Sequence, residues 1–433
     1  MTSIAFTSLF LGLVFGNQTV GVLVEGPAAA VEYQLDGKPL GRVGTAPWSL
    51  RVDLGEELSP HELVARALDS EGGEVARARQ WLNLPRERAE AEIVLERNEA
   101  GKAVAARLSW QSIVGSRPLA RSATFDGRPV GVDESGRIVL PAYDPVKTHL
   151  LSAQLEFSEG LRSRADVVLG GGATDEAKSE LTAIAVRTRN RRDLPPPDRL
   201  AGWFVERGRP LRVVAVEDGG GQVLIVRDRG NGEAEAVLEG YRYNQPARAS
   251  RLRYDMQLPG RIRTRLVWPV AKRYADERVS SDLFDSSHDF TTESLHWVLT
   301  RVFHPQGSLP QQRFADATAV AGLLAFGSSA RRAVVLVLGS PTDSSLLSPE
   351  AVRRYLASVR VPLHVWSLVD PAARPEFARW GPVADVGSID RLRKAFRALE
   401  ADLRSQRVVW FEGKHLPQKI ELTDKAVGVE LVP

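Results

Sequence analysis

The sequence of 433 residues predicts a multidomain fold in which two β-sandwich modules precede a three-layer α/β domain. The chain is longer than a typical single domain, so two to four domains are expected. An internal repeat of short β-prone segments occupies the first 170 residues, and two uniformly apolar segments follow, Gln222–Val226 and Ala333–Leu338. Uniformly apolar runs interleaved with helical segments are typical of central strands in a parallel sheet.

The apolar N-terminal segment, Ile4–Gly16, has the length of a signal-peptide core and is too short to span a bilayer. Residues 1–16 are therefore predicted to be a signal peptide that is removed before Asn17. This predicts export to the periplasm or the extracellular space. The alternative is that the segment is a first β-strand, which would leave the protein in the cytoplasm. No other segment is apolar enough for a transmembrane helix.

The internal repeat predicts two sandwich modules, at residues 17–85 and 89–170. Leu35–Gly41 returns as Phe125–Gly131, and His61–Ala67 returns as His149–Leu155, with offsets of 90 and 88 residues. Each repeat contains an Asp-Gly pair between β-prone runs, the signature of a tight hairpin turn. Short strands with frequent turns indicate a sandwich, and these modules resemble the small immunoglobulin-like modules of bacterial envelope proteins.

The remaining residues, 178–433, are predicted to form a Rossmann-like α/β domain with flanking strands. Antiparallel strands are expected within Leu181–Glu217, before the first apolar strand. Helices and strands then alternate, which favours a sheet covered by helices. The expected helices are Ala247–Met256, Thr292–Phe303, Phe314–Phe326, Pro349–Val359 and Ile389–Ser405, and the further strands are Ile262–Pro269, Leu363–Leu368, Val383–Val386, Arg407–Phe411, Lys419–Leu422 and Gly428–Val432.

The composition excludes several kinds of functional site and one class of partner. The sequence has no cysteine, which excludes disulfides, thiolate zinc sites and cysteine nucleophiles. The net charge is only +3, and the basic residues in Arg261–Leu266 alternate with apolar ones, as on the solvent face of a strand. We therefore expect no nucleic-acid partner. Ser287-His288-Asp289 contains the residue types of a catalytic triad, but contiguous residues cannot converge as a triad requires.

From Gln222 to Ser405 the order of strands and helices resembles a von Willebrand factor type A (VWFA) domain. That family carries a metal-ion-dependent adhesion site, with Asp-x-Ser-x-Ser after the first strand, a threonine from a later loop and an aspartate after the fourth strand. Such oxygen ligands suit magnesium, which an acidic group of a protein partner completes. Here the resemblance assigns the first acid to Asp228 and the threonine to Thr318, beside Asp316. Glycines occupy the positions of the other ligands. Gly230 and Gly232 are at the positions of the two serines, and Gly339 is at the position of the last acid. The next aspartate, Asp343, lies four residues after Gly339.

The resemblance therefore implies a degenerate site and a non-enzymatic envelope protein that binds a protein partner without a metal ion or other cofactor. Its binding loops would contain Asp228, Gly230, Gly232, Thr318, Gly339 and Ser340. One alternative is a magnesium-dependent adhesion module that uses Asp228, Asp316, Thr318 and Asp343. Two others are a hydrolase that uses the crevice at the strand ends, where parallel sheets bind ligands, and a structural spacer.

Overall fold

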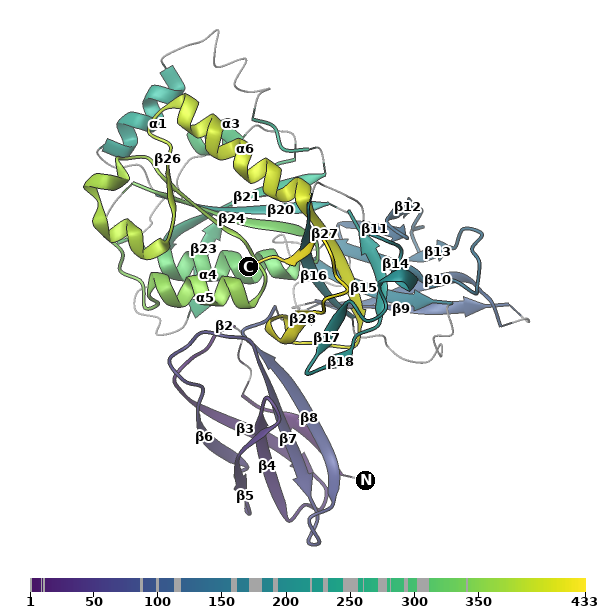
Figure 1. The fold of residues 1–433 in the computed structure, drawn as a ribbon. Coiled ribbons are helices and arrows are strands. Elements are labelled where there is room, and N and C mark those ends of the chain that lie inside the picture. Colours follow the sequence, from purple (N-terminus) through teal and green to yellow (C-terminus); the bar gives the residue numbers. More distant parts are fainter. Residues whose placement is uncertain are drawn as a thin grey trace.

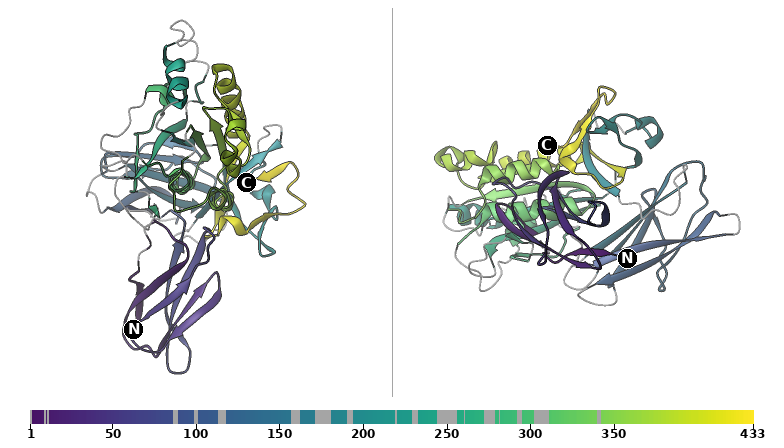
Figure 2. Two further views of the ribbon diagram at one scale, coloured as in Figure 1. Left: turned by 90° about the vertical axis from the view of Figure 1, so that its left-hand side faces the viewer. Right: turned by 90° about the horizontal axis from the view of Figure 1, so that it is seen from below.

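The computed structural model describes residues 2–8, 10, 12–85, 89–98, 101–112, 118–156, 162–170, 181–189, 194–218, 220–228, 233–243, 256–259, 261–271, 279–280, 282–291, 295–301, 311–339 and 342–433. The chain forms two β-sandwich modules, an α/β domain and a small β unit, which lies between the α/β domain and the second sandwich (Figure 1). The left view of Figure 2 shows that the first sandwich projects from the rest of the molecule. Within these residues no helix is long and apolar enough to cross a membrane.

The first sandwich packs a three-stranded sheet, β1-β3-β6, against a four-stranded sheet, β5-β4-β7-β8. Their inner faces enclose one apolar core that includes Val20, Tyr33 and Leu63. The strands are β1 (Ser3–Phe6), β3 (Asn17–Glu25), β4 (Ala30–Leu35), β5 (Lys38–Val43), β6 (Ser49–Asp53), β7 (His61–Leu68) and β8 (Glu74–Leu82).

The N-terminal apolar segment is part of this fold. All four residues of β1 pair with β3, so the sandwich begins at Ser3 and not at residue 17. Next along the chain, β2 (Gly12–Leu13) pairs with β22 (Val279–Ser280) of the α/β domain. The backbone N–H of Val14 donates to Asn83 Oδ1 at 2.7 Å. Of the two expectations for this segment, the structure therefore has the strand.

The second sandwich packs the sheet β13-β10-β9 against β12-β11-β14-β15, around a core that includes Leu108, Phe125 and Leu151. Both modules are thus β-sandwiches, as the repeat predicts. The strands are β9 (Ala89–Arg97), β10 (Ala103–Ser112), β11 (Ala120–Phe125), β12 (Arg128–Val130), β13 (Arg137–Val139), β14 (His149–Glu156) and β15 (Arg162–Leu169).

The repeated Asp-Gly and His residues form the same contact in both modules. Asp36 and Asp126 adopt positive φ angles of 54° and 49°, and each is followed by a positive-φ glycine, as a two-residue hairpin turn requires. Asp36 Oδ2 lies 2.9 Å from His61 Nδ1, and Asp126 Oδ2 lies 2.7 Å from His149 Nδ1. The histidine from a neighbouring strand thus fixes the turn by binding its carboxylate.

Asp36 also connects the first sandwich to the C-terminal part of the chain. Its Oδ1 lies 3.3 Å from Lys419 Nζ, and its carbonyl accepts from Arg207 at 3.2 Å. Burial alone would raise the pKa of Asp36, but the hydrogen bonds from His61 and the Glu62 amide and the charges of His61 and Lys419 lower it to about 2.

We expect Asp36→Asn to lower the free energy of unfolding by about 2 kcal/mol at pH 7, because the carboxylate is more strongly held in the folded state. Asparagine also tolerates positive φ, so the turn is kept. Since the folded pKa lies below the ordinary value of 3.8, the contribution is complete above pH 4 and disappears as the pH falls through about 2. Denaturant unfolding of both proteins at pH 7 and pH 2.5 measures the difference. A difference of equal size at both pH values would contradict the assignment.

The α/β domain is built on a six-stranded sheet in the order β23-β21-β20-β24-β25-β26, in which β23 alone is antiparallel to its neighbour. The first two apolar strands of the sequence, β20 and β24, lie side by side at its centre. The bounds are β20 (Gly221–Arg227), β21 (Ile262–Ala271), β23 (Phe284–Ser286), β24 (Arg331–Leu338), β25 (Leu363–Ser367) and β26 (Val383–Asp385).

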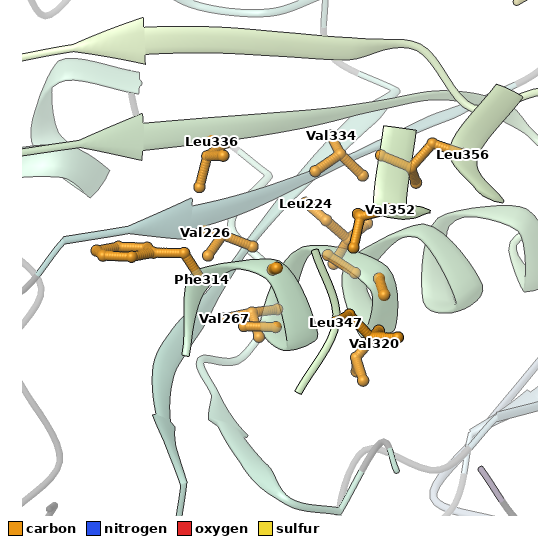
Figure 3. Packing of buried hydrophobic residues seen from close by; sticks show 14 of the residues in the cluster. Leu224, Val226, Val267, Phe314, Val320, Val334, Leu336, Leu347, Val352 and Leu356 are labelled. Carbon is orange, nitrogen blue, oxygen red and sulfur yellow. The ribbon is translucent and has the colours of Figure 1, made fainter. Parts of the chain in front are cut away.

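Helices cover both faces of this sheet and form three layers (Figure 1). On one face, α4 (Phe314–Gly327) and α5 (Pro349–Ser358) pack on alternate residues of the central strands, such as Leu224 and Leu336 (Figure 3). The other face carries α1 (Glu233–Tyr243), α3 (Leu295–Arg301) and α6 (Ile389–Ser405). Alternation between two apolar faces explains why the central strands are apolar at every position from Val223 to Val226 and from Ala333 to Leu338. Most of the expected helix Ala247–Met256 lies outside the described residues.

The two ends of the predicted 178–433 domain form a separate β unit, at residues 181–217 and 406–433. Its sheet has the order β19-β27-β16-β29, and β18-β17-β28 lie beside it. One face of β27 and β16 packs against the second sandwich, where Trp410 contacts the cluster that contains Leu150 and Val168. The strands are β16 (Leu181–Thr188), β17 (Phe204–Glu206), β18 (Arg209–Pro210), β19 (Val213–Glu217), β27 (Gln406–Glu412), β28 (Ile420–Leu422) and β29 (Val429–Leu431), with 3₁₀ turns η3 (Pro197–Leu200) and η6 (Pro417–Lys419).

Candidate functional site

The order of the strands predicts a ligand crevice at the ends of β20 and β24. The chain leaves β20 toward β21 on one side and later returns to β24 on the other, which makes this pair the switch point of the sheet. Ligands of open α/β sheets bind outside the carboxyl ends of the strands at such a point. Asp228 directly follows β20 and Gly339 directly follows β24. The N–H of Asp228 donates to the carbonyl of Val337 at 2.9 Å, which ties the two strand ends together.

Asp228 is fully buried, and neighbouring side chains compensate its carboxylate. Gln312 Nε2 donates to its Oδ2 at 3.2 Å. The adjacent Arg227 is buried over the ring of Trp268, at 5.0 Å, and donates to the carbonyl of Leu299. Burial lowers the pKa of Arg227 to about 10, and the charge of Asp228 opposes this shift. The amide of Gln312 therefore already binds the carboxylate that the resemblance assigns to the metal ion.

Asp316 is fully buried at the first turn of α4 and is bonded on both oxygens. Its Oδ2 lies 2.6 Å from the guanidinium of Arg313, and its oxygens accept from the backbone N–H groups of Leu346 and Leu347, both at 3.0 Å. The carboxylate therefore holds the loop after β24 against α4. Asp316 therefore has a structural role here, whereas the alternative ligand set predicts that it binds a metal ion.

Asp343 belongs to the same loop and caps α4. It accepts from the N–H groups of Phe314 at 2.9 Å and Ala315 at 3.2 Å, and from the Ser345 hydroxyl at 2.5 Å. Burial raises the pKa of Asp343, and these hydrogen bonds act in the opposite direction. Ser345 Oγ in turn accepts from the N–H of Asp316 at 3.2 Å. The first backbone donors of the helix are thus bonded to the loop, as a capped helix requires.

The other predicted ligands give no complete metal site. Thr318 is fully buried, and its hydroxyl has no hydrogen-bond partner among the described residues. A Cβ atom on Gly339 would lie 2.4 Å from Ala234 Cβ and 3.3 Å from Asp228 Cγ, so α1 fills the space that an acid at 339 would need. Gly230, Gly232 and Ser340 lie outside the described residues. The part of the chain that is described contains no group of three or more His, Asp or Glu side chains able to hold a metal ion.

A cavity of about 290 Å³ lies beside this crevice, at the same edge of the sheet. Its walls come from the end of β24, the loop that Asp316 and Asp343 hold, the starts of α4 and α5, and the 3₁₀ turn η5 (Pro375–Trp380), which follows η4 (Pro371–Ala373). Leu346 lies at this cavity and is 51% exposed. The lining residues are Phe314, Leu338, Asp343, Ser345, Leu346, Leu347, Ser348, Pro349, Glu376, Phe377, Arg379 and Trp380.

The sequence analysis did not assign the segment that contains η4 and η5. Phe377 and Trp380 stand there three residues apart among polar residues, and both are buried. This spacing places two aromatic rings on one side of a helical turn and was the available signal.

A second hollow, of about 680 Å³, lies between the second sandwich and the edge of the α/β sheet. It contains the two motifs that the sequence analysis set aside. Asp289 lies 2.7 Å from Arg265 Nε, and the hydroxyl of Ser287 donates to the carbonyl of His288 at 2.8 Å. The Ser-His-Asp residues therefore do not interact as a triad, and the strand arginine is paired with a carboxylate.

No protein-family model matches the sequence, and no curated protein matches it. Among solved structures the chain is similar to the fibronectin(III)-like modules of CbhA from Clostridium thermocellum, with 13% identity over 40% of this chain and 98% of that chain and a TM-score of 0.16. It is also similar to proximal thread matrix protein 1 of the mussel byssus, with 16% identity over 48% of this chain and 50% of that chain and a TM-score of 0.27. The D00-D0 domain of intimin matches with 12% identity over 39% and 99% of the two chains and a TM-score of 0.15. At such low scores these likenesses carry no function to this chain.

Proposed function

We propose that the chain is a non-enzymatic interaction protein of the cell envelope, in which a degenerate VWFA-like domain binds a protein partner at the carboxyl-end edge of its sheet. Export would then have to occur without cleavage before Asn17, because Ser3–Phe6 forms a strand of the first sandwich. The order of the sheet supports the VWFA assignment, since β20 runs into Asp228, α4 carries Thr318 and β24 runs into Gly339. This edge is also where doubly wound sheets place their ligand sites.

The observation that carries the proposal is Leu346. Its side chain is half exposed beside a cavity, and the loop that presents it is held by Asp316 and Asp343. The residues that dominate binding energy cluster in pockets near the centre of an interface, so an apolar side chain beside a cavity supports an interface at this edge. Scattered exposed apolar residues are common, so the position of Leu346 matters more than its exposure.

Binding without a bridging cation is the second part of the proposal. Asp228 already accepts from Gln312, and the carboxylates of Asp316 and Asp343 accept bonds from protein donors. A cation would have to displace these donors to obtain its oxygen ligands. We therefore expect partner binding to be the same with magnesium and with a chelator.

Leu346→Asp tests both parts at once. Immobilised wild-type chain, Leu346→Asp and Val427→Asp are compared for the proteins they retain from an envelope extract, in 5 mM EDTA and in 5 mM MgCl₂. Val427 is a matched control, because it is 83% exposed and lies in the β unit, in the turn before β29. We expect Leu346→Asp to lose specific partners at least tenfold, since burying a leucine contributes roughly 1.5–3 kcal/mol. Val427→Asp should retain them.

Two results would overturn the proposal. Retention that disappears in EDTA for the wild-type chain would restore a metal-dependent site. Equal retention by wild type and Leu346→Asp would remove the carboxyl-end edge as the interface. Equal thermal unfolding of the three proteins is the control for folding, since both replaced side chains are exposed.

A further inference from the structure

The carboxyl group of Glu217 lies where the β unit meets the second sandwich. Glu217 is the last residue of β19, and the apolar contact beside it joins Leu150 and Val168 of the sandwich to Trp410 of the β unit. We call this contact the junction. The indole of Trp410, which is 2% exposed, donates to Glu217 Oε2 at 3.3 Å. A buried indole N–H needs an acceptor, and Glu217 supplies it.

The cation of the junction is Arg164, on β15, and another carboxylate already holds it. Its guanidinium lies over the ring of Trp410, at 4.3 Å, and its Nε lies 2.9 and 3.1 Å from the two oxygens of Asp166. Its Nη2 donates to the hydroxyl of Ser152 at 2.9 Å. Among the described residues no ion pair involves Glu217, whose hydrogen-bond partner is Trp410. One arginine therefore serves two carboxylates, and it is bonded to Asp166.

The charged form of Glu217 is unfavourable in this place. Burial raises the pKa of Glu217, and the charges of Asp166 and Asp126 raise it further, against the charge of Arg164 and the hydrogen bond from Trp410. Asp166 and Asp126 belong to the second sandwich, whereas Glu217 belongs to the β unit. Moving the two apart would return water to Glu217 and remove the repulsion, so ionisation opposes this contact in particular.

The other charged groups on the elements around β19 have partners or face solvent. Glu217 is the acid among them that is half-buried and has no cation bonded to it. The others are Asp126, bound by His149; Glu412, paired with Arg212; Arg407, which donates to the carbonyl groups of Arg404 and Gln406; and the exposed Asp198, Arg199 and Asp218.

We infer that a single proton on Glu217 controls how firmly the β unit holds the second sandwich. The protonated carboxyl group still accepts from Trp410 and is not repelled by Asp166, whereas the ionised group is repelled and opposes the contact. Because the pKa of Glu217 in the folded chain lies above the ordinary value of 4.5, this stabilisation is fully present below pH 4.5 and is lost as the pH rises through the folded-state pKa. The junction therefore weakens on passing from acidic to basic solution.

The first measurement follows the indole N–H signal of Trp410 by two-dimensional NMR of the whole chain, from pH 4 to pH 8, with Trp410→Phe to assign the signal. We expect the wild-type signal to titrate with a midpoint above 4.5. Glu217→Gln should lose this titration, since the amide still accepts the bond but does not ionise. Asp166→Asn should lower the midpoint, because it frees Arg164 to pair with Glu217.

Hydrogen exchange measures the strength of the junction itself. Wild type, Glu217→Gln and Glu421→Gln are compared at the same pH, so that differences in intrinsic exchange rate cancel. Glu421 is the matched control, because it is an exposed acid of the same β unit, on β28. We expect β15 and β27 to exchange several-fold more slowly in Glu217→Gln than in wild type at pH 8, and equally at pH 4. Glu421→Gln should exchange as wild type does at both.

Three results would overturn the inference: a wild-type Trp410 signal without a midpoint above 4.5, a midpoint that Asp166→Asn leaves unchanged, or equal exchange of wild type and Glu217→Gln at pH 8. The wild-type titration needs no variant, so the inference can fail even where Glu217→Gln does not fold. This device is separate from the proposed interface, because the residues that line the cavity beside Leu346 all lie in the α/β domain.

Discussion

Gly339→Asp supplies the acid that a VWFA metal site requires after its fourth strand, and we expect it to destabilise the protein without creating a magnesium site. The Cβ atom of the new side chain would lie 2.4 Å from Ala234 Cβ, so α1 would have to move. Overpacking of this kind costs about 1–3 kcal/mol. The second carboxylate would also stand beside the buried Asp228, and an uncompensated charge there adds further cost. Together these terms predict a loss of about 3 kcal/mol or more in the free energy of unfolding.

Denaturant unfolding and titration with MgCl₂ by calorimetry measure the two expectations on the whole chain. Gly339→Ala isolates the steric part, because it adds the Cβ atom without the charge. The double variant Ala234→Gly with Gly339→Ala should recover most of that steric loss, since it removes the clashing atom. A stable Gly339→Asp protein that gives saturable heat with magnesium would show that the site is only one acid short of the family pattern. Saturable heat from the wild-type chain, lost in Asp228→Ala, would contradict the metal-free site altogether.

The sequence predicts best those features that depend on neighbouring residues. The Asp-Gly turns at Asp36 and Asp126 follow from the positive φ that such turns need. Apolar runs predict the central strands β20 and β24, because a strand that is covered on both faces needs apolar side chains on both. The repeat in the first 170 residues predicts two similar modules, and the same Asp–His contact forms in both.

Features that join distant segments are the ones the sequence does not reveal. The β unit pairs Leu181–Thr188 with Gln406–Glu412, and no local pattern indicates that two strands so far apart are partners. The helix Glu233–Tyr243 was not predicted, although its apolar residues Ala234, Val237, Leu238 and Tyr241 stand at the i, i+3, i+4 and i+7 spacing of a helix face. The strand pairing, in contrast, is decided by tertiary contacts and not by local propensity.

The candidate site shows the same limit at the level of side chains. Residue types alone make Asp316 and Asp343 equivalent to Asp228 as oxygen ligands. The structure separates them. Backbone N–H groups at the start of α4 bind Asp343, and backbone N–H groups of the loop after β24 bind Asp316.

The largest loss of stability is expected from deletion of residues 2–16, which the sequence analysis assigned to a signal peptide. The deletion removes β1 from the edge of a three-stranded sheet and the pairing of β2 with Val279–Ser280. It also removes Leu13, which is 2% exposed in the core cluster of the α/β domain, and the bond from Val14 to Asn83. Burial of one large apolar side chain contributes roughly 1.5–3 kcal/mol and each hydrogen bond about 1 kcal/mol. We therefore expect a loss of at least about 4 kcal/mol.

Denaturant unfolding of the full chain and of a chain that begins at Asn17 checks this, with Leu13→Ala to measure the part due to that one side chain, about 2–5 kcal/mol. The outcome also bears on export. If the shortened chain is as stable as the full one, the first strand is dispensable, as a cleaved signal peptide would be, and mass spectrometry of the protein from its native cell should find Asn17 at its N-terminus. If the shortened chain is unstable, cleavage at this point would remove part of the first sandwich and its attachment to the α/β domain. An exported form of this protein would then have to keep Ser3–Phe6, because the sandwich that projects from the molecule depends on that strand.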